Sequence, residues 1–144
     1  MLRQVLVGLA AGVVFLVLDG VLNANPLAQQ LYAVYQPLAR PGVNALVGSA
    51  IDLAYGVILA WLFVRLAPSM PGRTRLAKGL SFGLMVWFLR VVMRVAGEWV
   101  VTTVPPATHI YTLAAGLAQV LLVAVMIAAL LPQAGARGTP APQS

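Results

Sequence analysis

Four long apolar segments alternate with short polar stretches along this chain, at about residues 4–24, 43–66, 76–97 and 109–131. An α-helix needs roughly 20 predominantly apolar residues to cross a bilayer, and each segment reaches that length. The pattern therefore predicts an all-α membrane protein in which four transmembrane helices form an up-down bundle.

The segment of about residues 26–36, directly after the first span, is too short to cross a bilayer. Asn25 can cap a helix whose first position is Pro26, and Tyr32 and Tyr35 suit the headgroup level of a membrane. We expect a short interfacial helix here, with a folded loop as the alternative.

The last segment, residues 133–144, consists mainly of Pro, Gly, Ala and Gln. Such a composition cannot bury enough apolar surface to offset the entropy of ordering, so it predicts a disordered cytoplasmic tail. Residues 1–132 are then expected to form one transmembrane domain.

The composition supports a membrane location. Hydrophobic residues make up 61% of the 144 residues and charged residues only 8%, whereas about a quarter of the residues in soluble domains are charged. The chain has no Cys, which excludes disulfides and thiolate metal sites within it. With a single His and no acidic cluster at metal-ligand spacing, we expect neither a metal nor a cofactor.

Basic residues gather at one set of span ends, and this predicts the orientation. With the N-terminus in the cytoplasm, Arg40 alone lies on the outer side, and the cytoplasmic basic residues are Arg3, Arg65, Arg73, Arg75, Lys78 and Arg137. Lys and Arg are enriched in cytoplasmic loops, so we expect a multi-pass protein of the inner cell membrane with both termini cytoplasmic. The formal charge of +6 then reflects orientation. Nucleic-acid binding is not expected, because no basic stretch with interleaved aromatic residues lies outside the spans.

The first span also has the look of a signal peptide, because Met1-Leu2-Arg3 precedes a short apolar run. Leu22 and Ala24 would stand at the two key positions before a cut, and Leu is bulky there. We therefore expect the span to be retained.

Charged residues within the spans are the main functional signal. Arg90, Arg94 and Glu98 follow one another at four-residue spacing near the end of the third span, so they share one helix face and Glu98 can pair with Arg94. A charge at mid-bilayer costs about 3 kcal/mol, so such residues should face one another or water. In the predicted orientation they share the outer half of the bilayer with Asp19, and Asp52 lies deeper.

These charges and nearby polar positions define a candidate site. The proposed cluster consists of Asp19, Asn23, Asp52, Arg90, Arg94, Glu98 and Gln119. Candidate residues for the wall of a pocket around it are Trp87, Trp99, His109 and Tyr111.

Four roles are open for this cluster. It can be a structural network of ion pairs that sets the register of the bundle, or a pocket in which the planar arginines hold an anionic lipid headgroup or a small anion. A small dimeric proton-coupled transporter using Asp52 or Asp19 is an alternative, although the arginines would keep a neighbouring carboxylate ionised. An enzyme with His109 as base near Glu98 is a further alternative, without a serine–histidine–acid or metal signature. The sequence favours a noncatalytic subunit or accessory protein.

Small residues at four-residue spacing predict close helix contacts. Gly8 and Gly12 form one such pair, and the second span carries the stripe Asn44, Gly48, Asp52, Gly56 and Ala60. These stripes favour association with a second copy or with a larger membrane complex.

The first and third spans also resemble one another. Aligning Gly8 and Gly12 with Gly79 and Gly83 places Asp19 on Arg90 and Asn23 on Arg94. This predicts two helix-hairpin repeats, with chance similarity as the alternative.

Overall fold

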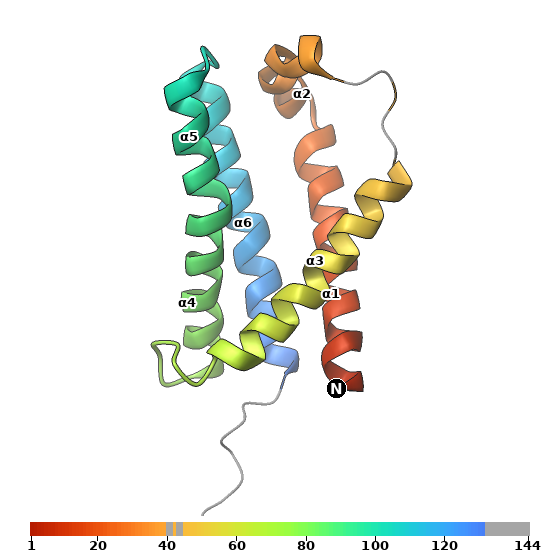
Figure 1. Cartoon of the computed structure of the whole chain (residues 1–144), viewed down its shortest axis with the longest axis vertical. Coiled ribbons are helices and arrows are strands. Elements are labelled where there is room, and N and C mark those ends of the chain that lie inside the picture. The colour runs from red at the N-terminus through yellow and green to blue at the C-terminus, as the bar shows by residue number, and fades with distance from the viewer. Residues whose placement is uncertain (40–41, 43–44, 132–144) are drawn as a thin grey trace, which may run out of the picture.

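The computed structural model describes residues 1–39, 42 and 45–131. These residues form the helices α1 (Leu2–Ala24), α2 (Pro26–Tyr32), the 3₁₀ helix η1 (Ala33–Leu38), α3 (Ala45–Leu66), α4 (Arg75–Trp87), the π-helix η2 (Phe88–Val92), α5 (Met93–Val101) and α6 (Pro106–Leu130) (Figure 1). No strand occurs in these ranges. Four helices are long and apolar enough to cross a membrane: α1, α3, the continuous helix Arg75–Val101 and α6. The predicted all-α class, with four helices long and apolar enough to cross a membrane, is confirmed.

The observed boundaries differ from the predicted ones mainly around the third and fourth spans. The third helix continues to Val101 instead of ending near residue 97, so Glu98 lies inside it. The fourth begins at Pro106, because proline lacks an N–H and is tolerated in the first turn of a helix. The predicted start of the second span, the predicted tail 133–144, and Arg40, Asn44 and Arg137 lie outside the described residues.

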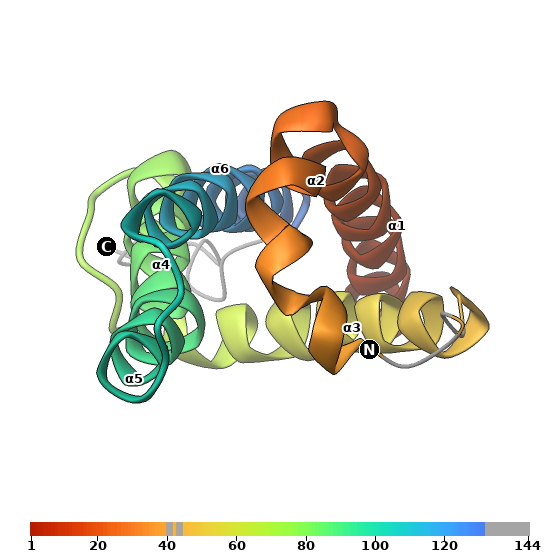
Figure 2. The same cartoon turned by 90° about the horizontal axis from the view of Figure 1, so that it is seen from above.

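Asn25 separates α1 from α2 by leaving the helical conformation. Its side-chain oxygen accepts a hydrogen bond from the Ala28 N–H at 2.9 Å, and Pro26 follows as the first helical residue. The predicted cap is therefore present, and the segment is a helix that continues as η1 to Leu38. Figure 2 shows α2 and η1 lying over the end of α1 and reaching toward α3.

The helices pack as two pairs, α1 on α3 and α4 on α6, and α1 and α6 join the pairs. The first pair is very close, because Gly8 and Gly12 both face α3. A Cβ atom added to Gly8 would lie 2.6 Å from Val57 Cα, and one added to Gly12 would lie 2.6 Å from Leu53 Cα. Gly56 fills the opposing position, where a Cβ would collide with the backbone of both α1 glycines.

The second pair uses its glycines in the same way. A Cβ atom on Gly79 would lie 2.6 Å from the Ala128 Cβ, and one on Gly83 would lie 2.9 Å from Leu121 Cδ2. Both predicted glycine pairs therefore lie at close helix contacts.

The small-residue stripe of α3 packs only in its second half. Gly56 and Ala60 are buried, whereas Gly48 is exposed and a Cβ there would meet nothing within 4 Å. The reason is the crossing itself, since α3 passes α1 obliquely and its first half diverges from α1 (Figure 1). The predicted close-packing stripe is therefore not continuous through Asp52 to Gly48.

The apolar core lies in the half of the bundle that contains the N-terminus. It is built from α1, the second half of α3, α4 and the second half of α6, and its largest fully buried side chains include Phe15, Phe63, Phe82, Leu59 and Ile127. Phe63 and Phe82 meet edge to face at 5.3 Å between ring centroids. This tight half leaves the other half of the bundle, beneath η1, free to separate.

The glycine contact between α1 and α3 can be tested by substitution. Gly56→Ala places a methyl group against the backbone of α1, and we expect it to lower the free energy of unfolding by about 1–3 kcal/mol. Gly48→Ala on the same helix meets open space and should change stability by no more than a few tenths of a kcal/mol. Helical circular dichroism during SDS titration in mixed micelles measures both. Equal effects would contradict the packing described.

Candidate functional site

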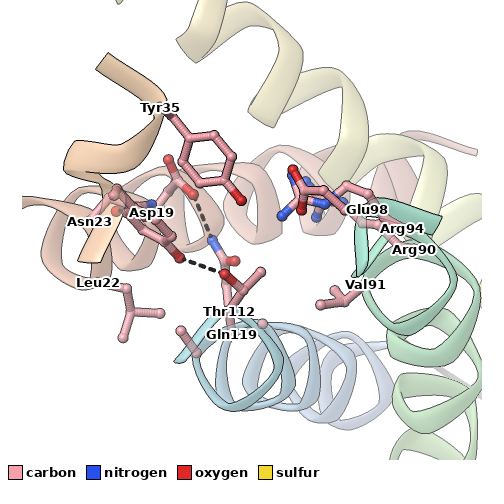
Figure 3. Close-up of a pocket in the computed structure, with 13 residues that line it drawn as sticks. Asp19, Leu22, Asn23, Tyr35, Arg90, Val91, Arg94, Glu98, Thr112 and Gln119 are labelled. Atoms are coloured by element: carbon pink, nitrogen blue, oxygen red, sulfur yellow. Dashed lines mark hydrogen bonds between the residues drawn. The ribbon is translucent and has the colours of Figure 1, made fainter. Parts of the chain in front are cut away.

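A cavity of about 430 Å³ lies between the separated halves of the helix pairs (Figure 3). Its wall is formed by the end of α1, by α2 and η1, by η2 and α5, and by the first half of α6. The lining residues are Asp19, Leu22, Asn23, Tyr32, Tyr35, Arg90, Val91, Arg94, Glu98, Thr112, Ala115, Gly116 and Gln119. Six of the seven residues predicted for the cluster thus line one cavity, and Asp52 does not.

Arg90, Arg94 and Glu98 form one wall, as their four-residue spacing predicts. A regular α-helix drifts by about 40° over four residues. The π-turn at Phe88–Val92, in which the Met93 N–H donates to the Phe88 carbonyl, is wider and takes up part of that drift. Single π-turns of this kind are frequent at functional sites, and the sequence pattern did not reveal this one.

Arg90 contacts aromatic rings across the bundle. Its guanidinium carbon lies 4.1 Å from the centroid of the Tyr55 ring and 4.6 Å from that of Phe15. These two rings also meet edge to face, at 5.1 Å. A cation over a ring face is attracted by the quadrupole of the ring, so Arg90 is held where α1 and α3 diverge.

The sequence analysis missed both rings that hold Arg90. A signal for them exists: Phe15 precedes Asp19 by one helical turn and Tyr55 follows Asp52 by three residues. Phe15 therefore shares a helix face with Asp19, and Tyr55 shares one with Asp52, and both acids belong to the predicted cluster.

Asp19 stands on the other side of the cavity with two amide side chains. Gln119 Nε2 donates to the Phe15 carbonyl at 3.2 Å and to Asp19 Oδ1 at 3.4 Å. Asn23 Nδ2 donates to the backbone carbonyl of Asp19 at 2.9 Å. Figure 3 shows Asp19 and Asn23 facing Arg90, Arg94 and Glu98 across the space.

The acids and bases of this cluster are gathered but not paired. Throughout residues 1–39, 42 and 45–131, no carboxylate oxygen lies within 4.0 Å of a basic nitrogen. The expected Arg94–Glu98 pair is therefore not formed. Arg90 contacts ring faces instead, and Arg94 is exposed toward the cavity.

Asp52 lies beside the cluster, next to the contact between α1 and α3. It is half-buried and within electrostatic range of Asp19 and Arg90. Its backbone carbonyl faces Gly12, where an added Cβ would lie 2.9 Å away. Asp52 thus contributes to the electrostatic potential at the cavity, although it does not line the wall.

Two tyrosines from the segment after α1 close the upper side of the cavity. The Tyr32 hydroxyl lies 3.2 Å from Thr112 Oγ1, and that oxygen donates its own proton to the Thr108 carbonyl, so Tyr32 is the donor. Burial raises the pKa of Tyr35 above its usual 10.0, and the hydrogen bond and charge of Glu98 raise it further. The Tyr35 hydroxyl is therefore held in its protonated form beside the Glu98 carboxylate.

The four candidate wall residues lie elsewhere. Trp87 Nε1 donates to the Leu113 carbonyl at 3.0 Å, and the Tyr111 hydroxyl donates to the Leu22 carbonyl. His109 is 2% exposed beneath Trp99, with ring centroids 5.3 Å apart, and neither of its nitrogens has a hydrogen-bond partner in the described chain. His109 and Glu98 are thus not brought together in the cavity, and the described residues contain no group of three His, Cys, Asp or Glu side chains that can hold a metal ion.

Comparisons with family models, with curated proteins and with solved structures found no match to this chain. The chemistry of the cavity therefore rests on its own side chains. Two guanidinium groups supply hydrogen-bond donors and positive charge on one wall, and an unpaired carboxylate stands on the other. Such a site can hold a charged polar group inside an otherwise apolar bundle.

The contact between Arg90 and Tyr55 should appear as a coupling energy. In a double-mutant cycle with Arg90→Met and Tyr55→Leu, we expect about 0.5–2 kcal/mol of coupling in unfolding free energy. The same cycle with Arg94→Met should give a value near zero, because residues without contact are additive. SDS unfolding of the four variants measures each cycle, and equal coupling in both would argue against a specific ring contact.

The interaction of Tyr35 with Glu98 predicts a pH dependence. Because folding raises the pKa of Tyr35, this residue stabilises the fold below about pH 10, and the contribution is lost as the pH rises through the folded-state pKa. Glu98→Gln should lower the pKa of Tyr35 toward 10.0, since it removes a carboxylate that raises it. An NMR titration of labelled tyrosine ring carbons, with Tyr35→Phe to assign the signal, tests this; an unchanged pKa in Glu98→Gln would refute the contact.

Proposed function

We propose that this chain is a small noncatalytic membrane protein that binds an anionic group, the phosphate or carboxylate of a lipid headgroup or of a small anion, at Arg90 and Arg94. The observation that carries the proposal is that two arginines line a cavity of about 430 Å³ without an acid within 4.0 Å of either in the described chain. Arginine presents a planar set of donors that matches phosphate and carboxylate groups.

The size of the cavity supports a ligand. Its volume lies within the range of about 300–1,000 Å³ that small-molecule sites occupy. The alternative role, a structural network that sets the register of the helices, requires acids and bases in contact. Their separation across a cavity favours a site whose charge balance is completed by a bound group.

The distribution of basic residues supports an orientation for this site. In our proposal the spans cross the membrane up and down with both termini in the cytoplasm, and the cavity opens at the outer end, beside an interfacial segment made of α2 and η1. Arg3 lies in the first turn of α1, Arg65 in the last turn of α3, and Arg75 in the first turn of α4. These helix ends lie together, opposite α2 (Figure 1), as expected for a cytoplasmic face.

Proton-coupled transport is the second candidate function. It is favoured by the electrostatic interaction between Asp19 and Asp52, because facing acids within membrane helices are the usual components of proton relays. It is less well supported than binding, because the cavity wall contains Asp19 but not Asp52.

Retention of an anionic lipid tests the proposed function. We expect the wild-type protein, exchanged into detergent from phosphatidylcholine nanodiscs containing phosphatidylglycerol, to retain phosphatidylglycerol, as measured by native mass spectrometry. Arg94→Gln should reduce retention about tenfold or more, since a hydrogen bond to a charged group contributes about 1.5–3 kcal/mol. Inorganic phosphate as a competitor distinguishes a small anion from a headgroup.

Arg73→Gln is the matched control, because it removes the same charge from the connection between α3 and α4, far along the chain from the cavity wall. Arg94 is preferred to Arg90 as the test position because Arg94 has no ring contact in the described chain to lose. If Arg94→Gln and Arg73→Gln retain phosphatidylglycerol as the wild type does, the arginine pair does not bind the headgroup.

A further inference from the structure

The wall opposite the arginines carries an unsatisfied acid and an unsatisfied amide oxygen. Asp19 accepts one long hydrogen bond, from Gln119 Nε2 at 3.4 Å, and no basic nitrogen of the described chain lies within 4.0 Å of its carboxylate. Because Gln119 Nε2 donates to Asp19 and to the Phe15 carbonyl, Oε1 points away from both. Gln119 is 8% exposed, and its Oε1 has no partner in the described residues.

The charges that line the cavity sum to zero. Arg90 and Arg94 carry two positive charges, and Asp19 and Glu98 carry two negative ones. The two acids differ in their surroundings, because Glu98 shares one helix with both arginines, whereas Asp19 stands alone on α1. The arginine wall therefore keeps an excess of positive charge and donors, and the Asp19 wall keeps negative charge and acceptors.

We propose that the ligand is a zwitterion, with a phosphate or carboxylate at Arg90 and Arg94 and a primary ammonium at Asp19 and Gln119. This inference rests on the proposed function, since it assigns the second half of the same cavity. A purely anionic ligand would leave Asp19 unpaired and would be repelled by it. An ammonium group satisfies the carboxylate by charge and Gln119 Oε1 by a hydrogen bond.

The acceptors on this wall also distinguish among cationic groups. A primary ammonium has three N–H donors, which match the Asp19 carboxylate and Gln119 Oε1. A trimethylammonium group has none, and it is recognised instead by cages of aromatic ring faces. The two rings that line this cavity, Tyr32 and Tyr35, are tilted by 44° to each other with centroids 6.2 Å apart, and they do not form an aromatic cage at the Asp19 wall. An ethanolamine-type amine fits this wall better than choline.

The ligand can be an aminophospholipid headgroup or a free aminophosphate, because both present the same two charges. The test uses wild-type protein in nanodiscs that contain phosphatidylethanolamine, its mono- and dimethylated forms, phosphatidylcholine and phosphatidylglycerol with the same acyl chains. Native mass spectrometry after exchange into detergent reports which lipid is retained. We expect retention to fall with each methyl group, and to be about tenfold or more higher for phosphatidylethanolamine than for phosphatidylcholine. Because this comparison needs no substitution, it stands even where a variant fails to fold.

Asp19→Asn then isolates the proposed ammonium site. We expect this variant to lose the preference for phosphatidylethanolamine over phosphatidylcholine and to keep or increase its retention of phosphatidylglycerol. Asp52→Asn is the matched control, because it removes an acid that does not line the cavity, and it should keep the preference. Arg94→Gln should lose both phosphatidylethanolamine and phosphatidylglycerol.

Soluble phosphoethanolamine separates the two sources of the ligand. If phosphoethanolamine displaces retained phosphatidylethanolamine at millimolar concentration, the site binds the free molecule. If it does not, the site binds the lipid. Both results support recognition of a phosphate together with a primary ammonium. Equal retention of phosphatidylethanolamine and phosphatidylcholine by the wild type, or an unchanged preference in Asp19→Asn, overturns the zwitterion inference. If the zwitterion inference is overturned but Arg94→Gln loses phosphatidylglycerol, the proposed anion site still stands. If Arg94→Gln retains phosphatidylglycerol, both proposals are wrong.

Discussion

The close crossing of α1 and α3 is the contact on which the rest of the structure depends. Gly8, Gly12 and Gly56 let the two backbones touch, and a single Cβ at any of them would overlap the opposite helix. Lipid tails are as apolar as the side chains, so close backbone packing replaces the hydrophobic effect as the source of helix association. Because α3 crosses α1 obliquely, its first half diverges from α1 (Figure 1). The cavity lies on another side of α1, with a wall formed by α1, α2, η1, η2, α5 and α6.

The cavity changes how the charges within the helices are stabilised. In a closely packed bundle, charges within the membrane would have to pair with one another to offset the cost of burial. Here the described acids and bases stand apart around a space of about 430 Å³. Arg90 rests on the rings of Phe15 and Tyr55, while Glu98 lies near the Tyr35 hydroxyl and raises its pKa. The charged side chains are thus stabilised by aromatic rings, by a neighbouring tyrosine and by access to the cavity. Charged groups that face a cavity without pairing are expected of a binding site.

The two opposite walls of the cavity differ in charge. Positive charge gathers on the helix that contains η2 and α5, and unsatisfied acceptors gather on α1 and α6. The bundle thereby separates the opposite charges of Asp19 in the first span and Arg90 in the third. The apolar core in the other half of the bundle keeps these walls in place.

The sequence by itself determined the all-helical class, the four helices long and apolar enough to cross a membrane, the cap at Asn25 and six of the residues that line the cavity. These follow from local patterns, because apolar length, capping chemistry and helical spacing act within one segment. Only the tertiary structure decided that Asp52 stays outside the wall, that Tyr32 and Tyr35 enter it, and that Trp87, Trp99, His109 and Tyr111 lie elsewhere. The physical reason is that the angle between α1 and α3 and the π-turn at Phe88–Val92 set which faces meet, and both arise from contacts between residues far apart along the chain.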